Sequence, residues 1–285
     1  MPNVQDLRRR LRSVKNMQQI TRAMKMIAAA RMRRAQDRVL SARPYEKQMR
    51  AFLESLAARV EDRSHPLLAE RPIQRILLVV VTADRGLCGA FNSNLIRAVQ
   101  KYLADHSDAE VQMIAVGRKG RDFFRKRSVQ MAGEYVNLFQ RPVAFASAQQ
   151  LATQIVELYG SGTVDAVDFI HNEFKSLLAS NLIEERCLPL RARKPQEGET
   201  LVDYLYEQPP EEILSRLLPR YVEAEIYRAL LESQAAEFAA RMTAMDTATN
   251  NANDLIRSLT LYLNRVRQAA ITKEIIEIVS GAAAL

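Results

Sequence analysis

The chain has 285 residues, of which 48% are hydrophobic and 26% charged, a composition that is typical of a folded protein and not of a disordered one. No apolar run approaches the roughly 18 residues that cross a bilayer, and the first twenty residues lack the apolar core of a signal peptide. The two cysteines, Cys88 and Cys187, are too few for a disulfide framework and lack the paired spacing of a zinc site.

The first segment is basic and contains no helix breaker. The net charge of the chain is +8, and residues 1–50 alone carry 14 Lys and Arg against three Asp and Glu. Between Pro2 and Pro44 there is neither glycine nor proline, which predicts a long helix, and Asn3 with Asp6 forms a capping pair at its start. Apolar residues recur at helical spacing and then shift register by one step: Val4, Leu7, Leu11 and Val14, followed by Met17, Ile20, Met24 and Ile27.

The middle of the chain holds eight of the nine glycines and alternates between two patterns. Residues 75–82 form a continuous apolar run, which is typical of a strand buried on both faces of a parallel sheet. Further helices and strands follow in turn, and this order predicts a Rossmann-like α/β domain with a parallel sheet. We expect helices near 93–104, 121–126 and 147–159, and strands near 111–116, 135–138 and 166–170.

The last segment is again free of breakers, from Pro219 to Gly281. Its apolar residues step by three and four, the seam of a left-handed coiled coil: Met245, Ala248, Ala252, Leu255, Leu259, Tyr262, Val266 and Ala269. Two such stripes at opposite ends predict an antiparallel coiled coil of the terminal helices, although core helices of an all-α domain would show a similar stripe. The expected fold is therefore α/β plus a long coiled coil, with helical segments 1–58 and 210–285 around a central α/β domain 73–192.

Candidate catalytic and ligand-binding residues are few. The loop TADRGLCGAFN, residues 82–92, follows the first strand, where α/β proteins hold ligands, but it fits neither a P-loop nor GxGxxG. The segment 117–120 is too short to cradle a polyphosphate, so we interpret both as structural turns. The histidines His65, His106 and His171 form no ligand pattern. We predict no catalytic residue, no cofactor and no metal.

Nucleic-acid binding is an alternative for the basic first segment. Its arginines would decorate a helix as they do in a DNA-binding basic region. However, no aromatic residue that could stack on a base occurs before Tyr45, and the arginines interleave with apolar residues. Tight DNA binding with a steep dependence on salt would favour this alternative.

Several motifs resemble those of one family, the gamma subunits of bacterial F-type ATP synthases. The C-terminal stretch ITKEIIEIVSGAAA, residues 271–284, resembles the signature of that family. The stretch SVKNMQQITRAMKMIAAA, residues 13–30, is similar to its first helix, and TADRGLCGAFN and DYLYE, residues 203–207, match in the same order. The resemblance covers essentially the whole chain.

The resemblance implies a rotor that transmits torque and has no catalytic site. The terminal helices would form a shaft inside the hexamer of alpha and beta subunits, and the α/β domain would lie beside the epsilon subunit on the membrane ring of c subunits. The contacts with alpha and beta would be made by Arg22, Met24, Lys25, Arg267, Gln268, Thr272 and Glu274. The foot on the c-ring and epsilon would be Tyr204, Leu205, Tyr206 and Glu207.

The resemblance also implies a place in the cell and a stoichiometry. One copy per complex would lie peripherally on the cytoplasmic side of the bacterial plasma membrane and would touch the membrane only through the c-ring. No nucleic acid would be a partner. The cysteine-bearing insert of the plant chloroplast form has no counterpart here, so we predict no thiol switch.

Overall fold

A computed structural model describes residues 4–57, 65–177, 179–190 and 208–283. The contacts within the chain divide it into two compact units. The terminal unit pairs residues 1–29 with residues 241–285, and the central unit comprises residues 30–240. The expected cap at Asn3 lies outside the described residues.

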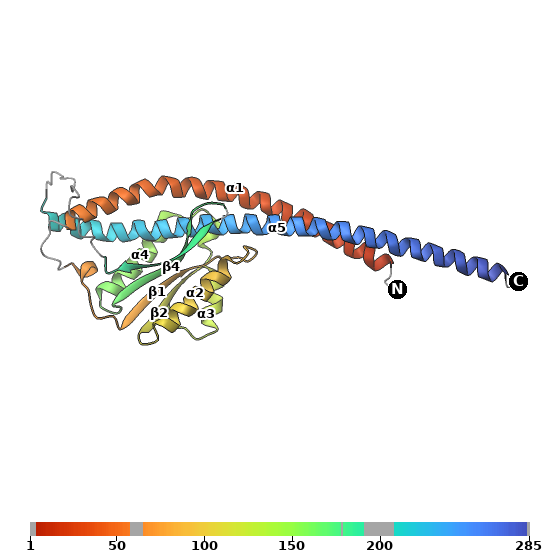
Figure 1. Ribbon diagram of the computed structural model, residues 1–285. Helices are drawn as coiled ribbons and strands as arrows, with labels where there is room; N and C mark the ends of the chain where they lie inside the picture. The colour runs from red at the N-terminus through yellow and green to blue at the C-terminus, as the bar shows by residue number, and fades with distance from the viewer. Residues whose placement is uncertain (1–3, 58–64, 178, 191–207, 284–285) are drawn as a thin grey trace, which may run out of the picture. The chain divides into compact units, whose positions relative to one another are not determined.

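Two long helices begin and end the described chain, as the sequence predicts (Figure 1). Helix α1 spans Val4–Ala57 and continues through Pro44, and helix α5 spans Pro210–Ala283 and continues through Pro219. A proline removes one helical hydrogen bond, and helices as long as these tolerate that loss when packing holds the flanking turns. Among the described residues, none of the helices combines the length and the apolarity needed to span a bilayer.

The central unit contains a five-stranded sheet with the order β3-β2-β1-β4-β5. Four strands are parallel: β1 (Arg75–Val81) pairs with β2 (Glu110–Val116) on one side and with β4 (Ala166–Phe174) on the other, and β2 pairs with β3 (Met131–Tyr135). Strand β5 (Ser180–Leu188) is antiparallel to β4 and forms one edge. The sheet is thus mixed, and the expectation of a purely parallel sheet is wrong at this edge. Because an edge strand is partly solvated, β5 is polar and gives no apolar run.

Three helices connect the parallel strands: α2 (Phe91–Asp105), α3 (Arg118–Arg125) and α4 (Phe145–Gly160). Residues 76–81 of β1 are completely buried, as expected for a central strand covered on both faces. The strand expected at 135–138 lies earlier, at Met131–Tyr135, and residues 138–140 form a short 3-10 helix instead. Asn137 adopts a left-handed conformation, with φ of 66°, which ends the strand.

The terminal segments form an antiparallel pair whose register differs from the expected one. On α1, the buried and half-buried positions 4, 7, 11, 14, 18, 21, 25 and 28 follow steps of three and four without a shift, and Met24 beside them is half-buried as well. Met17, Ile20 and Ile27, which we expected in the seam, are 57%, 56% and 56% exposed. The predicted register shift on α1 is wrong, because polar residues of α1 occupy the positions that face α5, and the apolar residues that suggested the shift lie on the outer side of the helix. On α5, Met245 and Ala252 are buried as predicted, whereas Leu255 and Tyr262 are exposed.

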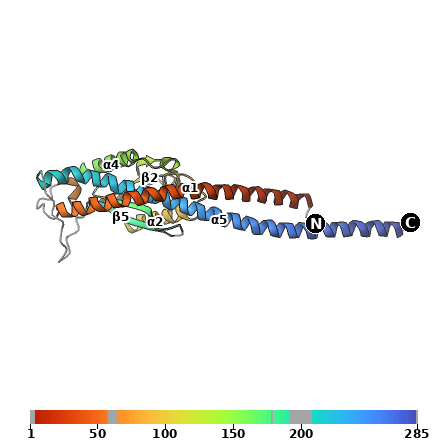
Figure 2. The same cartoon turned by 90° about the horizontal axis from the view of Figure 1, so that it is seen from above.

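The two long helices also pack against each other in the central unit, again in antiparallel order (Figure 2). Arg50 of α1 lies 2.7 Å from Glu225 of α5, and Arg43, earlier on α1, lies 3.0 Å from Glu232, later on α5. Val39 and Leu56 of α1 and Leu230 of α5 are buried in the hydrophobic core that also contains the sheet. The expected fold class, long terminal helices with a central α/β domain, is confirmed.

Candidate functional site

Three pairs of polar side chains join α1 to α5 inside the terminal unit, and we call them the polar ladder. In each pair a residue of α1 meets a residue of α5, with bonds of 2.9 Å between the two threonine hydroxyls and 2.6 Å between the lysine Nζ and the aspartate Oδ1. The amide pair is also hydrogen-bonded. The pairs are Gln18 with Asn253, Thr21 with Thr249, and Lys25 with Asp246. As the number rises on one helix it falls on the other, so the ladder defines one antiparallel register.

The ladder specifies the register but adds little stability. The side chains of Lys25 and Asp246 are 40% and 48% exposed, and an ion pair at such exposure contributes at most about 1 kcal/mol. A polar residue at a seam position selects one register because a slipped register would leave its hydrogen-bonding groups without partners. Sequence reasoning named Lys25 only as a contact with alpha and beta and missed the other five residues; the available signal was the unbroken spacing 14, 18, 21, 25 and 28.

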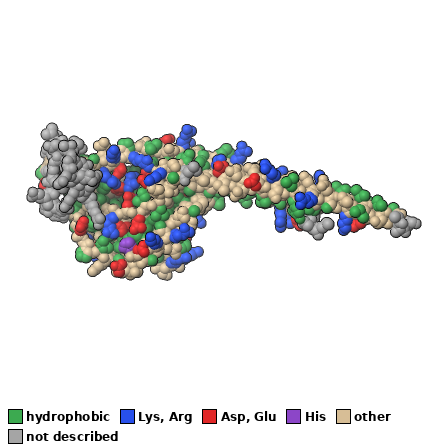
Figure 3. Space-filling view, viewed as in Figure 1, with side chains coloured by type: hydrophobic (Ala, Val, Ile, Leu, Met, Phe, Trp, Pro, Cys, Tyr) green, Lys and Arg blue, Asp and Glu red, His purple; other side chains and the backbone are tan. Residues whose placement is uncertain are grey.

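Outside the ladder, the terminal unit exposes many large apolar side chains. In Figure 3 they lie open along the C-terminal part of the chain. They are Met17, Ile20, Met26 and Ile27 on α1, and Leu255, Leu261, Tyr262, Ile271, Ile275, Ile276, Ile278 and Val279 on α5. An apolar surface of this extent, around a seam with a polar stretch, marks an interaction surface. We call it the terminal apolar surface.

The seven residues that we expected to contact alpha and beta all lie on the two helices of the terminal unit. Arg22 is exposed and Met24 is half-buried, whereas Lys25 points to the partner helix and binds Asp246. The other four are exposed on the last part of α5: Arg267, Gln268, Thr272 and Glu274. The foot residues Tyr204, Leu205, Tyr206 and Glu207 lie outside the described residues. Whether these residues bind partners stays a prediction.

The loop after β1 is closed by its own side chains. The Asp84 carboxylate is almost fully buried and accepts the backbone N–H groups of Arg118, Asn137 and Phe139 at 3.1, 2.7 and 3.2 Å. The Thr82 hydroxyl accepts the Gly120 N–H at 2.8 Å. Three loops at the carboxyl end of the sheet are therefore tied together where an α/β enzyme would hold its ligand. These contacts support a structural turn.

Gly117 allows the chain to pass this point. Its φ is 90°, and a Cβ atom there would lie 2.0 Å from the backbone oxygen of Thr82. Cys88 is buried in the same turn and its Sγ receives a contact from Asn92 Nδ2 at 3.1 Å. The thiol is therefore packed into the turn, away from solvent.

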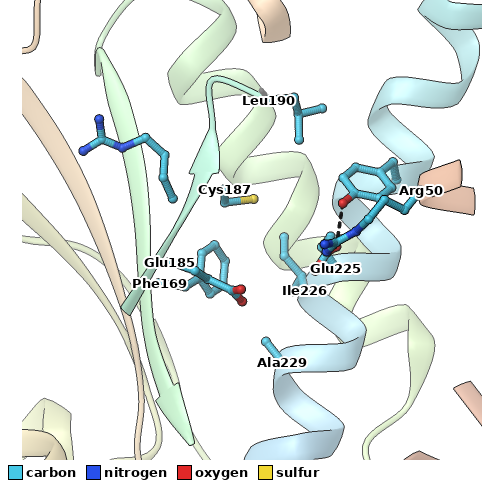
Figure 4. Close-up of a pocket in the computed structure, with 10 residues that line it drawn as sticks. Arg50, Phe169, Glu185, Cys187, Leu190, Glu225, Ile226 and Ala229 are labelled. Atoms are coloured by element: carbon cyan, nitrogen blue, oxygen red, sulfur yellow. Dashed lines mark hydrogen bonds and ion pairs between the residues drawn. The ribbon is translucent and has the colours of Figure 1, made fainter. Parts of the chain in front are cut away.

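A pocket lies between β5 and the two long helices of the central unit (Figure 4). Glu225 is at its wall and accepts hydrogen bonds from Arg50 at 2.7 Å, Tyr221 at 2.6 Å and Arg228 at 2.7 Å. Burial alone would raise the pKa of Glu225, but Arg228, Tyr221 and Arg50 together lower it to about 2. Arg228 also binds Glu185 on β5 at 2.8 Å. The charged groups of the pocket wall thus satisfy one another.

The groups in this pocket that could act in catalysis are held in inactive forms. Burial raises the pKa of the Cys187 thiol, so the thiolate is not formed at neutral pH. His171 does not line the pocket, but its Nε2 lies 3.7 Å from Glu185 Oε1; burial, followed by the nearby Arg228, lowers the pKa of His171 to about 3, so its ring is neutral. Among residues 4–57, 65–177, 179–190 and 208–283, no group of three or more His, Cys, Asp or Glu could hold a metal ion. The arrangement is an ion network that packs β5 against the helices.

A long helix pair with an open apolar surface, attached to an α/β domain whose ligand edge is closed, is typical of a subunit of a larger assembly. The comparisons agree with this class. The family described as ATP synthase matches residues 3–285. The ATP synthase gamma chain of Solibacter usitatus is 54% identical over 100% of this chain and 99% of the relative. That of Heliobacterium modesticaldum is 47% identical over the full length of both. The chain therefore belongs to the ATP synthase gamma chain family.

Solved structures show the same fold. A chain of the Tetrahymena thermophila mitochondrial ATP synthase central stalk and c-ring structure is 26% identical, with a TM-score of 0.58 over 80% of this chain and 99% of that chain. A chain of the Euglena gracilis mitochondrial ATP synthase rotor has a TM-score of 0.69 over 94% and 98%, at 20% identity. The second likeness concerns the fold alone.

Proposed function

We propose that this chain, a central-stalk subunit of the F-type ATP synthase, transmits torque between the membrane c-ring and the catalytic hexamer without a catalytic site of its own. Proton flow would thereby be coupled to ATP synthesis or hydrolysis in other subunits. The observation that carries the proposal is the terminal apolar surface: this chain belongs to the ATP synthase family and exposes large apolar side chains on both of its terminal segments.

The mechanism follows from differential contact. A rotating subunit can shift a neighbour between conformations only if it binds those conformations unequally. Moving a two-state equilibrium from 1:99 to 99:1 takes about 5.5 kcal/mol of such a difference. The terminal unit is unequal around its axis, because α1 and α5 carry different apolar residues and different charge: residues 1–29 have seven Lys and Arg against one Asp, whereas residues 241–285 have five against four Asp and Glu. Each of three catalytic subunits would therefore meet a different face.

The partners and their contacts complete the proposal. The contacts with alpha and beta would be made on α1 by Arg22, Met24 and Lys25, and on α5 by Arg267, Gln268, Thr272 and Glu274. Tyr204, Leu205, Tyr206 and Glu207 would form the foot on epsilon and the c-ring. One copy would serve each complex, peripherally on the cytoplasmic side of the bacterial plasma membrane. The segments 1–58, 73–192 and 210–285 would be its functional divisions.

Reconstitution with alpha and beta subunits and the membrane sector tests this function. We expect the double variant Arg267→Ala, Gln268→Ala to lower ATP-driven proton transport while the chain keeps its helix content. The control is Glu212→Ala, Arg216→Ala, which removes an exposed ion pair of 2.7 Å from the same helix in the central unit. ATP hydrolysis by the purified chain alone would contradict the non-catalytic role. Tight, salt-sensitive DNA binding without affinity for alpha and beta would favour the nucleic-acid alternative.

A further inference from the structure

Strand β4 extends beyond the strand that pairs with it in the parallel part of the sheet. The pairing of β1 with β4 ends at Val80 and Ile170, whereas β4 continues to Phe174. Buried backbone groups need hydrogen-bond partners, and beyond Ile170 β1 no longer supplies them to β4. The backbone of Asn172 and Phe174, alternate residues on one side of this strand, is held instead by side chains of the two long helices.

Two hydrogen bonds hold the Phe174 backbone, and two more join the side chains that make them. Glu232 of α5 accepts the Phe174 N–H at 2.9 Å, and Arg43 of α1 donates to the Phe174 carbonyl from Nη2 at 2.8 Å. Arg43 also binds the Glu232 carboxylate with Nε at 3.0 Å and Nη2 at 3.2 Å. At the next residue of α5, Ser233 Oγ lies 3.3 Å from the backbone nitrogen of Asn172 and 3.4 Å from its carbonyl oxygen. We call Arg43, Glu232 and the Phe174 backbone the strand clamp.

The strand clamp differs from the packing around it in being directional. Apolar contact stabilises α1, α5 and the sheet, but the hydrophobic effect has no orientation and does not by itself fix the angle between two groups. A two-bond pair of guanidinium and carboxylate has a fixed geometry, and bonds to ionised groups are the stronger ones. The Glu232 side chain is only 2% exposed, so water does not compete for its carboxylate, whereas the Arg43 side chain is 41% exposed. A small rotation of the helices about β4 would break these bonds.

The clamp also differs from the ion network at the pocket in how it reaches the sheet. That network joins β5 to α5 through Arg228 and Glu185, so two flexible side chains lie between the backbones. In the clamp, one side chain reaches the strand backbone directly from each helix.

We propose that the strand clamp is the torsional joint of this subunit: Arg43 and Glu232 are positioning residues that make the sheet and the helix pair turn together. The inference rests on the rotor function proposed above. Both helices continue along the chain into the terminal unit, so a firm joint between sheet and helices lets a rotation of the sheet reach that unit through the covalent helices.

A single-molecule rotation assay tests the joint in the complete complex. A bead is attached to α2 through Gln100→Cys, an exposed position, in a background without Cys88 and Cys187, and the hexamer is fixed to the surface. We expect Arg43→Lys, which keeps the charge but loses the planar fork, and Glu232→Gln to widen the angular spread of the bead in each dwell. The control Glu212→Gln, the same change at an exposed pair of α5, should leave the spread unchanged.

Each outcome has a separate meaning. If the bead turns in the unsubstituted complex and its angular spread is the same in both clamp variants, the joint is refuted while the rotor function stands. A bead that never turns during ATP hydrolysis would overturn the rotor function itself. Should neither variant assemble, amide exchange of Phe174 in the unsubstituted complex decides: protection like that of the buried strands supports the clamp, and exchange as fast as that of an exposed loop refutes it.

Discussion

The substitution Glu225→Gln tests the ion network of the central unit. Glu225 is 12% exposed and receives hydrogen bonds from both helices, through Arg50 of α1 and through Tyr221 and Arg228 of α5. The glutamine has nearly the same shape, so the substitution removes the negative charge and leaves the packing. The two arginines keep Glu46 and Glu185 as partners, which limits the loss to the contribution of one carboxylate.

The magnitude follows from the pKa of Glu225. Its environment lowers the pKa from 4.5 to about 2, and one pKa unit corresponds to about 1.4 kcal/mol, so the carboxylate contributes about 3 kcal/mol. Because the folded pKa is lower than the unfolded one, this contribution is present above pH 4.5 and is lost as the pH falls toward 2. For a chain of this size, about 3 kcal/mol corresponds to a melting temperature roughly 6 to 12 °C lower.

Urea unfolding followed by far-ultraviolet circular dichroism, at pH 7 and again near pH 3, measures this effect. We expect the variant to lose stability at pH 7 and to approach the unsubstituted chain at acid pH. The control Glu212→Gln removes a carboxylate whose ion pair is exposed and should cost less than about 1 kcal/mol. If Glu225→Gln is no more destabilising than this control, or if its effect is the same at both pH values, the network does not stabilise the fold as argued.

Three other substitutions test different parts of the structure. Between pH 6.5 and pH 5 the buried His171, with a pKa of about 3, costs the folded chain about 2 kcal/mol of stability, because the unfolded chain takes up the proton first; His171→Leu should remove this loss. Urea unfolding across that pH range measures the effect, and an unchanged pH dependence would contradict it. Gly117→Ala should destabilise the fold by about 3 kcal/mol or more, because the backbone there has φ of 90° and the added Cβ collides with the Thr82 backbone. Gly160→Ala, where a Cβ meets nothing, should change stability by less than about 0.5 kcal/mol. Thermal melts measure both, and similar losses for the two would refute the steric argument. A double-mutant cycle on Lys25→Ala and Asp246→Ala should give a coupling energy below about 1 kcal/mol, and a much larger value would mean that this half-exposed pair stabilises the coiled coil as well as setting its register.

Elements with a strong pattern could be predicted from the sequence. The apolar run of β1 and the breaker-free terminal segments had one plausible structure each, and the structure has them. Strand β5 could not be found in this way, because its centre, Glu184, Glu185 and Arg186, is charged, and Glu185 and Arg186 find their partners Arg228 and Asp168 only in the folded protein. Charged residues of an edge strand read as a loop when their partners are unknown.

The register of the terminal helices shows the limit of apolar periodicity. The prediction followed Met17, Ile20 and Ile27 because they are hydrophobic, whereas the structure buries Thr21 against Thr249. A helix whose outer surface also contacts a partner has apolar residues on two sides, and the sequence does not say which side faces the neighbouring helix. The clamp is equally hidden, since Arg43 and Glu232 are 189 residues apart.

The central claim is that the paired terminal segments turn as one body, and a reversible crosslink inside the polar ladder tests it most directly. The hydroxyls of Thr21 and Thr249 are 2.9 Å apart, so Thr21→Cys with Thr249→Cys places two thiols face to face. We predict that the oxidised complex carries out ATP-driven proton transport as fast as the reduced one, because the two segments need not separate or slide during rotation. Loss of transport on oxidation, with recovery on reduction, would contradict the account.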